Sequence, residues 1–204
     1  MPKLMSQTQP EPCPECGFRH QCICHHVPRI DSNIELALLT HSNEFTRDTN
    51  TGKLLTQTLN HCNVYEWQRK SPPQDLLDKI ANPKIQAFVV YPTEDSITTS
   101  EAFTSSLSGQ TPLFIILDGT WQEAKKMINK SDWLSKLPSV HLKVEQTSNY
   151  QLRRNQDEGH LCTCEVGSQL LVESGHTDHA QQLDQYFDLY MRVFKADKCG
   201  HALS

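Results

Sequence analysis

Hydrophobic and polar residues are arranged along the chain in a pattern that predicts strands alternating with helices. Strands are predicted at four stretches, 34–39, 84–90, 113–117 and 139–144, of which the third is a continuous apolar run. Helices are predicted at 50–59, 75–81, 120–128 and 179–195. Residues 93–112, between the second and third predicted strands, are expected to form a polar loop. This alternation predicts an α/β fold with a largely parallel sheet flanked by helices.

The length of the chain suits one folded domain with a small addition. At 204 residues and 37% hydrophobic content, the chain can bury a full core. We expect a disordered leader at 1–12, a cysteine-rich knuckle at 13–29 and an α/β domain at 30–204. No apolar run approaches the length that spans a bilayer, and residues 1–10 lack the apolar core of a signal peptide. These features predict a cytoplasmic protein with no membrane partner, and they indicate no particular oligomeric state.

Eight cysteines in a chain expected in the cytoplasm predict metal binding and buried thiols rather than disulfides. Four of them, Cys13, Cys16, Cys22 and Cys24, lie within a dozen residues in the spacing C-x₂-C-x₅-C-x-C. Four thiolates this close together fit a closed, tetrahedral Zn²⁺ site of the structural kind. Arg19, in the loop between the two ligand pairs, is a candidate contact for RNA phosphates.

Other interpretations of the cysteine cluster differ in how well the flanking sequence supports them. Pro12-Cys13-x-x-Cys16 matches half of the zinc deaminase signature, but the histidine and glutamate that this chemistry needs upstream are missing. A thioredoxin-like pair is disfavoured because no predicted strand precedes the cysteines. Reactive or metal-free thiols remain an alternative, as do His25 and His26 as substitute ligands.

The charge of the chain is unevenly distributed. The formal net charge is −5, which by itself argues weakly against nucleic-acid binding. However, residues 119–154 hold seven Lys or Arg against three Asp or Glu, whereas residues 155–190 hold seven Asp or Glu and no Lys or Arg. This segregation permits a basic face for RNA phosphates if the blocks in the sequence also form patches in space.

A strand-to-helix junction places a carboxylate where α/β sheets bind ligands. Asp118 follows the apolar strand at 113–117, at the carboxyl end where ligand crevices of open sheets lie. Thr120 and Glu123 have the spacing of a capping box, which predicts that a helix begins there. Asp118 is therefore a candidate functional residue, although a capped helix with a turn aspartate has the same pattern.

Residues after a second strand add to the same predicted crevice. Tyr91 and Pro92 end the strand at 84–90, so we expect them at the sheet edge that carries Asp118. Trp121 either packs over a ligand or anchors its helix to the sheet. The free N–H groups at the start of that helix suit an anionic carboxylate.

Two further segments supply candidates with more than one interpretation. Glu44, Arg47 and Lys53 either face RNA or cap the helix that follows them. Beyond Tyr150, Arg153 could hold a carboxylate bidentately and Arg154 a phosphate, unless both belong to a solvated basic turn.

The stretch at 161–165 is expected to open a helix. Thr163 could cap this helix, and Glu165 is well placed for the helix dipole. Cys162 and Cys164 are expected to be small buried residues, because the cysteine cluster upstream is already complete.

Five stretches, in order along the chain, resemble those of the DTW-domain family. They are the cysteine cluster, the segment 41–55, the pair Tyr91-Pro92, the D-x-T-W stretch 118–121, and the S-x-Y-x-L-R stretch 148–153 with Thr163-x-Glu165 beyond it. The segment 41–55 is similar to the family's H-P-x-E…N-T-G pattern but has Ser42 where proline is usual. The resemblance implies a SPOUT-like, knotted α/β fold.

The resemblance also implies a reaction, namely transfer of the 3-amino-3-carboxypropyl group from S-adenosylmethionine to a uridine base in RNA. Transfer RNA is the expected substrate and partner, and ribosomal RNA, used by a related branch, is the alternative. Asp118 is the expected general base, with a pKa raised by burial, or else a ligand of the cofactor. The alternative functions are methyl transfer from the same cofactor and a non-catalytic zinc-knuckle module that binds RNA.

The expected site residues fall into three sets. The expected contacts of S-adenosylmethionine are Tyr91, Pro92, Leu117, Asp118, Gly119, Thr120, Trp121, Tyr150, Arg153, Thr163 and Glu165. The expected ligands of a structural Zn²⁺ are Cys13, Cys16, Cys22 and Cys24. The expected RNA contacts are Arg19, Arg47, Lys53 and Arg154.

Overall fold

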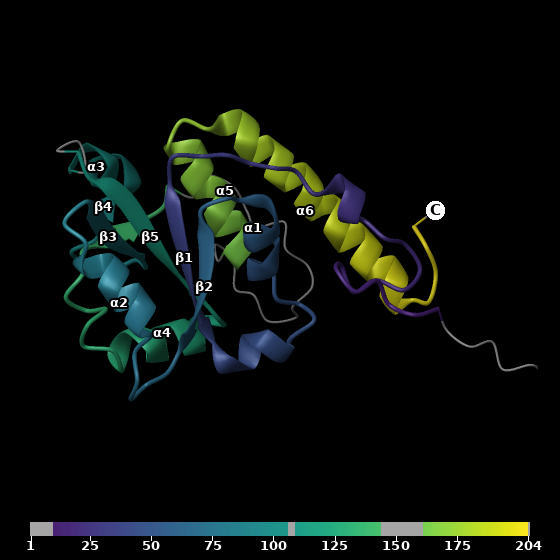
Figure 1. Ribbon diagram of the computed structural model, residues 1–204, viewed down its shortest axis with the longest axis horizontal. Coiled ribbons are helices and arrows are strands. Elements are labelled where there is room, and N and C mark those ends of the chain that lie inside the picture. The colour runs from purple at the N-terminus through teal and green to yellow at the C-terminus, as the bar shows by residue number, and fades with distance from the viewer. Residues whose placement is uncertain (1–9, 106–108, 144–160, 204) are drawn as a thin grey trace, which may run out of the picture.

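Six parallel strands form one sheet in the computed structural model, which describes residues 10–105, 109–143 and 161–203 (Figure 1). The strands are β1 (Glu35–His41), β2 (Cys62–Trp67), β3 (Ile85–Val90), β4 (Ile97–Thr98), β5 (Thr111–Asp118) and β6 (Ser139–His141). Their order across the sheet is β2-β1-β5-β3-β6-β4, and neighbouring strands all pair in parallel. The carboxyl ends of all these strands therefore lie at one edge of the sheet.

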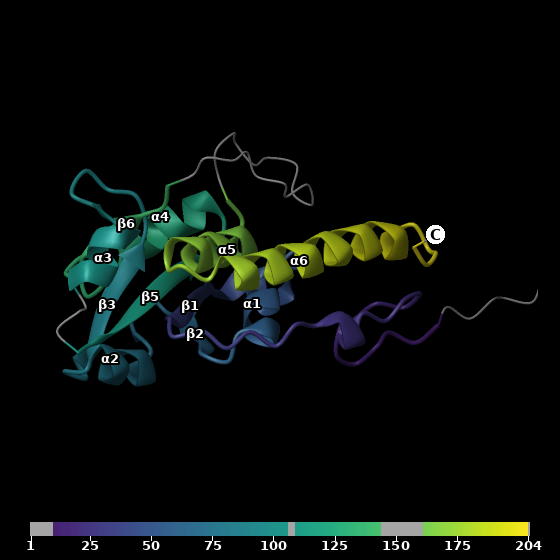
Figure 2. The ribbon, with the colours of Figure 1, turned by 90° about the horizontal axis from the view of Figure 1, so that it is seen from above.

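Helices cover both faces of the sheet because strand side chains alternate between two apolar cores. The helices are α1 (Gly52–Thr58), α2 (Gln74–Ala81), α3 (Thr99–Ser105), α4 (Trp121–Asn129), α5 (Thr163–Glu173) and α6 (Thr177–Lys198), with short 3₁₀ turns η1 (Cys24–His26) and η2 (Ser42–Thr46). Leu38 and Ile116 enter the core shared with α1, α3, α5 and α6, whereas Leu39 and Ile115 enter the core shared with α2 and α4. Figure 2 shows α5 and α6 on one side of the sheet and α2 on the other.

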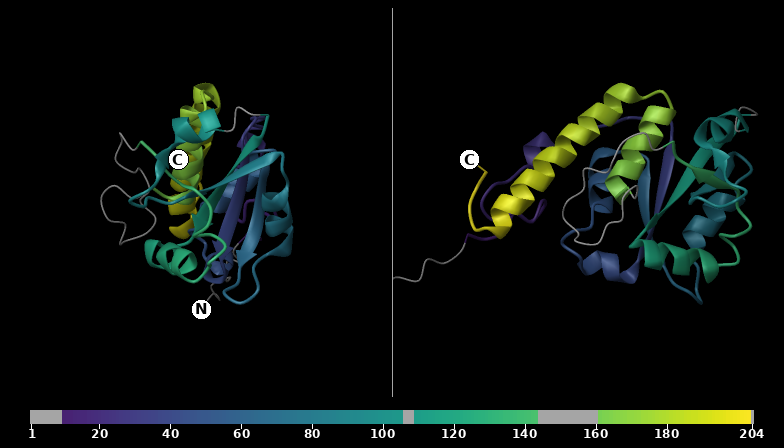
Figure 3. Two further views of the ribbon diagram at one scale, coloured as in Figure 1. Left: turned by 90° about the vertical axis from the view of Figure 1, so that its left-hand side faces the viewer. Right: turned by 180° about the vertical axis from the view of Figure 1, so that it is seen from behind.

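The cysteine-rich segment near the N-terminus packs along the last helix. Phe18 contacts Tyr190, with the two ring centroids 5.3 Å apart. The backbone N–H groups of Arg19 and His20 both donate to Oδ1 of Asp197, each over 2.8 Å. Figures 1 and 3 show this segment, in purple, beside the C-terminal end of α6. These contacts hold the segment against the folded domain.

The strands and helices predicted from the sequence pattern are present, with shifted ends. The helix predicted at 50–59 begins only at Gly52, and the strand predicted at 139–144 ends at His141. The α/β class, the parallel sheet and the flanking helices are thereby confirmed. None of the helices in the described ranges combines the length and the apolar character that a membrane crossing requires. The knot implied by the family resemblance stays a prediction.

Two parts of the fold differ from the sequence-based expectation. The prediction of a polar loop after Pro92 is wrong, since β4, α3 and the first residues of β5 lie between 93 and 112. Helix α3 is rich in Thr and Ser and carries only Ala102 and Phe103 as apolar residues, too few for a helical stripe. Strand β2 was not predicted, because as an edge strand it buries only its two end residues. Its buried and exposed side chains therefore do not alternate.

Candidate active site

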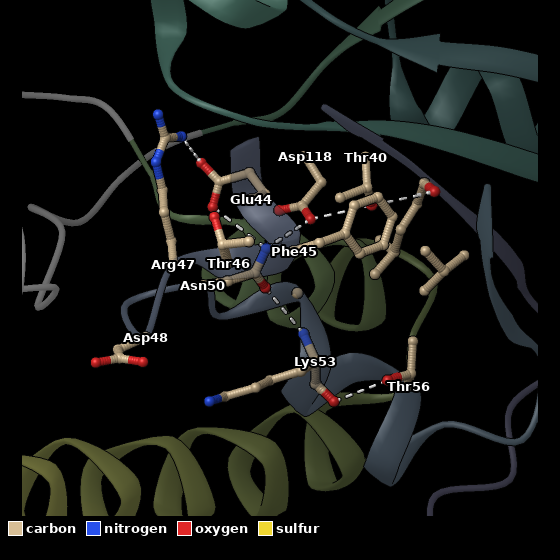
Figure 4. A pocket seen from close by; sticks show the side chains of 13 residues that line it. Thr40, Glu44, Phe45, Thr46, Arg47, Asp48, Asn50, Lys53, Thr56 and Asp118 are labelled. Atoms are coloured by element: carbon tan, nitrogen blue, oxygen red, sulfur yellow. Dashed lines mark hydrogen bonds and ion pairs between the residues drawn. The ribbon is translucent and has the colours of Figure 1, made fainter. Parts of the chain in front are cut away.

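Asp118 lies at the carboxyl end of β5 and is almost fully buried, with 3% of its surface exposed. Its Oδ2 accepts hydrogen bonds from Thr40 Oγ1 over 3.1 Å and from Asn50 Nδ2 over 2.9 Å. Its Oδ1 accepts a hydrogen bond from Thr163 Oγ1 over 2.7 Å. Thr40 is paired with Asp118 across β1 and β5, Asn50 precedes α1, and Thr163 begins α5. The carboxylate therefore joins the sheet edge to the starts of two helices, and Figure 4 shows its contacts with Thr40 and Asn50.

The surroundings of Asp118 change its affinity for a proton. Burial raises the pKa of Asp118 above its ordinary value, and the neighbouring Glu44 carboxylate acts in the same direction. The hydrogen bonds from Asn50, Thr163 and Thr40 oppose this rise, because they stabilise the charged form. The net direction is the one expected for a carboxylate buried at a strand end, and a raised pKa makes a carboxylate a better proton acceptor.

A second buried carboxylate, that of Glu44, lies beside Asp118 on η2. Glu44 is 1% exposed, accepts a hydrogen bond from Asn50 Nδ2 over 3.2 Å, and forms an ion pair with Arg47. Arg47 also donates to both carboxylate oxygens of Glu123, over 2.7 and 2.9 Å. The bond to Glu123 is the main reason why the pKa of Arg47 lies above its ordinary value, although burial acts in the opposite direction. One guanidinium thus joins two carboxylates from separate elements.

The predicted capping box at the start of α4 is confirmed. Thr120 Oγ1 accepts a hydrogen bond from the N–H of Glu123 over 3.3 Å, and Glu123 Oε2 accepts one from the N–H of Thr120 over 2.9 Å. Burial opposes ionisation of Glu123, but hydrogen bonds from Arg47, Thr120 and Asn43 hold the pKa of its carboxyl below the usual range. Glu123 is therefore charged and fixes both the start of α4 and the guanidinium of Arg47.

Gly52 and Gly119 allow the backbone to approach these carboxylates closely. A Cβ on Gly52 would lie 3.0 Å from Asp118 Oδ2, and one on Gly119 would lie 3.1 Å from Glu123 Cβ. Side chains at either position would press on the carboxylates. The two glycines therefore allow the backbone to pack closely against Asp118 and Glu123.

The residues predicted to line one crevice divide into two groups at the carboxyl edge of the sheet. Tyr91 and Trp121 contact each other, with ring centroids 5.7 Å apart, and Trp121 is 39% exposed. These rings lie on the α4 side of the sheet, whereas Asp118 and Thr163 lie on the side of α1 and α5. Of the remaining predicted contacts, Leu117 is buried, Gly119 and Thr120 are half-buried, and Pro92 is exposed. The turn from Asp118 to Trp121 connects the two groups.

The start of α5 differs from the expectation in one respect. The N-cap is Cys162 and not Thr163, which is the first residue inside the helix. The hydroxyl of Thr163 instead donates a charge-assisted hydrogen bond to the Asp118 carboxylate. Glu165 lies in the first turn as predicted, where its Oε2 accepts a hydrogen bond from the N–H of Cys162 over 2.8 Å. Cys162 and Cys164 are buried, as expected.

The cations predicted to bind RNA occupy three different environments. The guanidinium of Arg47 is held between two carboxylates, as described above. Lys53 is half-buried with its Nζ 5.1 Å from the ring centroid of Tyr190, and burial lowers its pKa although Asp48 opposes this shift. Arg19 is exposed and donates from Nη1 to the carbonyl of Pro10 over 3.0 Å.

The candidates Tyr150, Arg153 and Arg154 lie outside the described residues. Their predicted roles toward a carboxylate and a phosphate therefore stay predictions.

A pocket of about 290 Å³ opens beside the buried carboxylates (Figure 4). It lies between η2, α1 and the β1–β2 side of the sheet. Asp118, Asn50 and Glu44 contribute polar atoms to its lining, whereas Phe45 and Val64 contribute apolar side chains. The candidate general base thus faces a space of the size of a small ligand.

The four cysteines of the N-terminal cluster lie close enough together to bind one metal ion. Their Sγ atoms all lie within 4.8 Å of one another, with 3.7 Å between Cys13 and Cys22 and 3.6 Å between Cys13 and Cys24. A tetrahedral site with Zn–S bonds of 2.3 Å places its sulfurs about 3.8 Å apart. The donor set of Cys13, Cys16, Cys22 and Cys24 therefore fits Zn²⁺.

Two residues that hold Asp118 in place were not among the predicted site residues. Thr40 and Asn50 both donate to its carboxylate, yet neither belongs to a motif that was assigned a role beside Asp118. Their signals were weak but present, since Thr40 is a polar residue at the end of an apolar strand and Asn50 begins the Asn-Thr-Gly stretch. The interaction of Arg47 with Glu123, 76 positions apart, had no signal in the sequence.

The fold and the site together define an open-sheet α/β protein whose candidate active site lies at the carboxyl edge of a parallel sheet. Its central stretch, Asp118-Gly119-Thr120-Trp121, carries the D-x-T-W sequence. Residues 10–195 match the DTW domain, and the chain belongs to this family.

Similar proteins carry names that describe tRNA-modifying enzymes. Over 158 residues the chain is 30% identical to tRNA-uridine aminocarboxypropyltransferase 2 of Drosophila melanogaster, a match that covers 74% of this chain and 61% of that protein. It is 32% identical over 130 residues to tRNA-uridine aminocarboxypropyltransferase A of Arabidopsis thaliana, covering 54% and 47% of the two chains. With tRNA-uridine aminocarboxypropyltransferase 2 of Mus musculus, it shares 29% identity over 164 residues, covering 76% and 54%. The chain thus spans about half to three fifths of these relatives. No solved structure matches it significantly.

Proposed function

We propose that this protein transfers the 3-amino-3-carboxypropyl group of S-adenosylmethionine to a uridine base in tRNA and releases methylthioadenosine. Membership of the DTW family and similarity to proteins named tRNA-uridine aminocarboxypropyltransferase support the proposal. The observation that carries it is the buried Asp118 carboxylate, which is part of the D-x-T-W stretch and lines a pocket at the carboxyl edge of the sheet.

Asp118 is the proposed general base. The ring N–H of uridine is a weak acid and must lose its proton before the nitrogen can form a bond to carbon. A carboxylate offers about four lone-pair positions, and the hydrogen bonds from Thr40, Asn50 and Thr163 use three of them. The remaining position suits the ring N–H, and the three bonds hold the carboxylate in one orientation. As the new N–C bond forms, the bond between the attacked carbon of S-adenosylmethionine and its sulfonium sulfur breaks.

The proposed cofactor contacts follow the family pattern. S-adenosylmethionine supplies an electrophilic carbon next to its sulfonium. The proposed contacts are Tyr91, Pro92, Leu117, Asp118, Gly119, Thr120, Trp121, Tyr150, Arg153, Thr163 and Glu165. Among these, the adjacent rings of Tyr91 and Trp121 offer apolar surface, and the first N–H groups of α4 suit a carboxylate.

The proposed roles of the cysteine cluster and of the cations are structural support and RNA binding. A Zn²⁺ bound by the four cysteines would hold the knuckle in one conformation against α6. Arg19, Lys53 and Arg154 are the proposed RNA contacts. For Arg47, the ion pairs with Glu44 and Glu123 favour support of the site over phosphate binding.

Nucleoside mass spectrometry tests the proposed reaction. Bulk tRNA is incubated with the purified protein and S-adenosylmethionine and then digested to nucleosides. We expect a new uridine heavier by one aminocarboxypropyl group, which is lost in Asp118→Asn. The control is Asp95→Asn, because Asp95 is an exposed aspartate after another strand of the same sheet and should keep full activity.

The other outcomes of this experiment contradict different parts of the proposal. A methylated nucleoside would show that the protein transfers a methyl group from the same cofactor and not the aminocarboxypropyl group. Product in ribosomal RNA and none in tRNA would show that the substrate is ribosomal RNA. Failure with both RNAs, together with RNA binding that Asp118→Asn leaves unchanged, would favour a non-catalytic RNA-binding module.

A further inference from the structure

The pocket beside Asp118 combines buried polar groups with exposed apolar side chains. Phe45 on η2 is 56% exposed and Val64 on the edge strand β2 is 44% exposed, yet both contribute to its lining. Deeper in the pocket lie Asp118, Asn50 and Glu44, all of which are buried. A phenylalanine that is half exposed contributes little to the core of the domain. Its place at the pocket therefore suggests a contact with a ligand.

The size and chemistry of the pocket suit a small, polar ring. Its volume of about 290 Å³ lies at the lower end of the range for small-molecule pockets, which suits a single nucleotide unit. An aromatic face at the opening can stack on a heterocycle, while the amide and carboxylate groups inside can hydrogen-bond to its edge.

Two of the carboxylates that line the pocket are paired with cations. The carboxylate of Glu44 is paired with Arg47, and that of Asp48 is paired with Lys198 over 2.7 Å. Lys53 also contributes to the lining and supplies a further positive charge. Glu44 and Asp48 are therefore each paired with a cation, and a phosphate next to the bound ring would meet Lys53.

We propose that this pocket receives the uracil ring of the target nucleotide, turned out of the RNA and stacked on Phe45, with its N–H edge toward Asp118. This inference rests on the proposed function. Enzymes that modify a base inside folded RNA or DNA must bring that base out of its stack, and an aromatic side chain then replaces the lost stacking.

The pocket is distinct from the part of the proposed cofactor surface that Tyr91 and Trp121 form. Tyr91 and Trp121 lie on the α4 side of the sheet, whereas the pocket lies on the side of α1, and Asp118 is the proposed cofactor contact that also lines the pocket. Gly52 keeps the approach to this carboxylate short, because a Cβ there would lie 3.0 Å from Asp118 Oδ2. A uracil in the pocket would thus reach Asp118 from the side of α1, whereas Tyr91 and Trp121 would contact the cofactor on the side of α4.

Binding of short RNAs to the full-length protein tests the role of Phe45. One RNA carries a central uridine, and the other is identical except that this nucleotide has no base. Stacking of one base on an aromatic side chain corresponds to about fivefold or more in affinity. We expect the wild-type protein to prefer the uridine strand by at least about fivefold, and Phe45→Ala to lower this preference by about fivefold or more. Phe45→Trp should restore the preference.

A matched control and a cofactor measurement complete the test. Val172→Ala removes an apolar side chain that is 40% exposed on α5, away from the pocket lining, and should leave the preference unchanged. The Kd of S-adenosylmethionine, measured by calorimetry, should be the same for Phe45→Ala and wild type. With tRNA as substrate, Phe45→Ala should lower kcat/KM by about fivefold or more, through a higher KM for tRNA.

The possible failures separate this inference from the proposed reaction. If wild type modifies tRNA and Phe45→Ala keeps both the uridine preference and the KM, the pocket assignment is wrong and the reaction stands. If Phe45→Ala weakens binding of S-adenosylmethionine instead of RNA, the pocket belongs to the cofactor and the inference is overturned. If wild type forms no product, the proposed reaction fails, and the comparison of the two RNAs still decides whether Phe45 binds a base.

Discussion

Asn50 Nδ2 lies 2.9 Å from Asp118 Oδ2 and 3.2 Å from Glu44 Oε2, so one side-chain amide joins two buried carboxylates. Two negative charges held close together in a medium of low dielectric repel each other strongly. The donors of Asn50 offset part of this repulsion, and Arg47 supplies a positive charge next to Glu44. Stability and catalytic geometry therefore depend on the same contacts at this site.

Asn50→Ala should both destabilise the protein and lower its activity. The substitution leaves the two carboxylates with one donor fewer, and unsatisfied buried groups of this kind cost about 1–3 kcal/mol in the free energy of unfolding. Urea denaturation measures the stability, and nucleoside mass spectrometry measures the product. Asn60→Ala, at an exposed asparagine, is the control and should match wild type in both. A variant at position 50 with unchanged stability and activity would contradict the role assigned to this amide.

The ion pair between Glu123 and Arg47 should make stability depend on pH. The pKa of Glu123 in the folded protein lies below its unfolded value of about 4.5. A lowered pKa means that the unfolded chain binds more protons in this range, so the stabilisation is complete above pH 4.5 and is lost as the pH falls toward the folded pKa. Glu123→Gln keeps a side chain that can complete a capping box but removes the charge.

The free energy of unfolding, measured for wild type and Glu123→Gln between neutral and acidic pH, checks this prediction. We expect the deficit of the variant to be largest near neutral pH and to shrink below about pH 4.5. Glu94→Gln, at an exposed glutamate, should show no such trend. A deficit that stays constant across the pH range would show that the charge of Glu123 contributes nothing.

Gly167→Ala should destabilise the contact between α1 and α5. A Cβ at Gly167 would lie 2.4 Å from Cδ2 of Leu55, a buried side chain of α1 that cannot move into solvent. Overpacking of this kind costs about 1–3 kcal/mol, more than the gain of about 0.5–1 kcal/mol from replacing glycine by alanine in a helix. In the double variant Leu55→Ala/Gly167→Ala the clash is removed. A double-mutant cycle by urea denaturation should therefore show that the two losses are not additive.

The cysteine cluster should bind one zinc ion per chain and support the end of α6. In Cys16→Ser, elemental analysis should show loss of zinc, and hydrogen exchange should quicken around Tyr190 and Asp197, which contact the knuckle. Cys199→Ser is the control, because Cys199 is exposed and outside the cluster. Zinc that remains bound in Cys16→Ser, or its absence from the wild-type protein, would contradict the assignment.

Much of the architecture was predictable because it depends on local patterns. The apolar run at 113–117 indicated a strand covered on both faces, and Thr120 with Glu123 indicated where α4 begins. Strand β2 escaped prediction because an edge strand buries few of its residues. Helix α3 was not predicted because its helical conformation depends on packing rather than on an apolar stripe.

The candidate site was predictable only where its residues follow one another in the sequence. The sequence alone determined that a carboxylate would stand at a strand end before a capped helix, and that four cysteines could share a metal. Only the tertiary structure decided that Thr40, Asn50 and Thr163 would donate to Asp118, and that Arg47 would pair with Glu123. Capping and apolar periodicity act over a few residues. Hydrogen bonds between segments, by contrast, depend on strand order and helix placement, which arise only when the whole core packs.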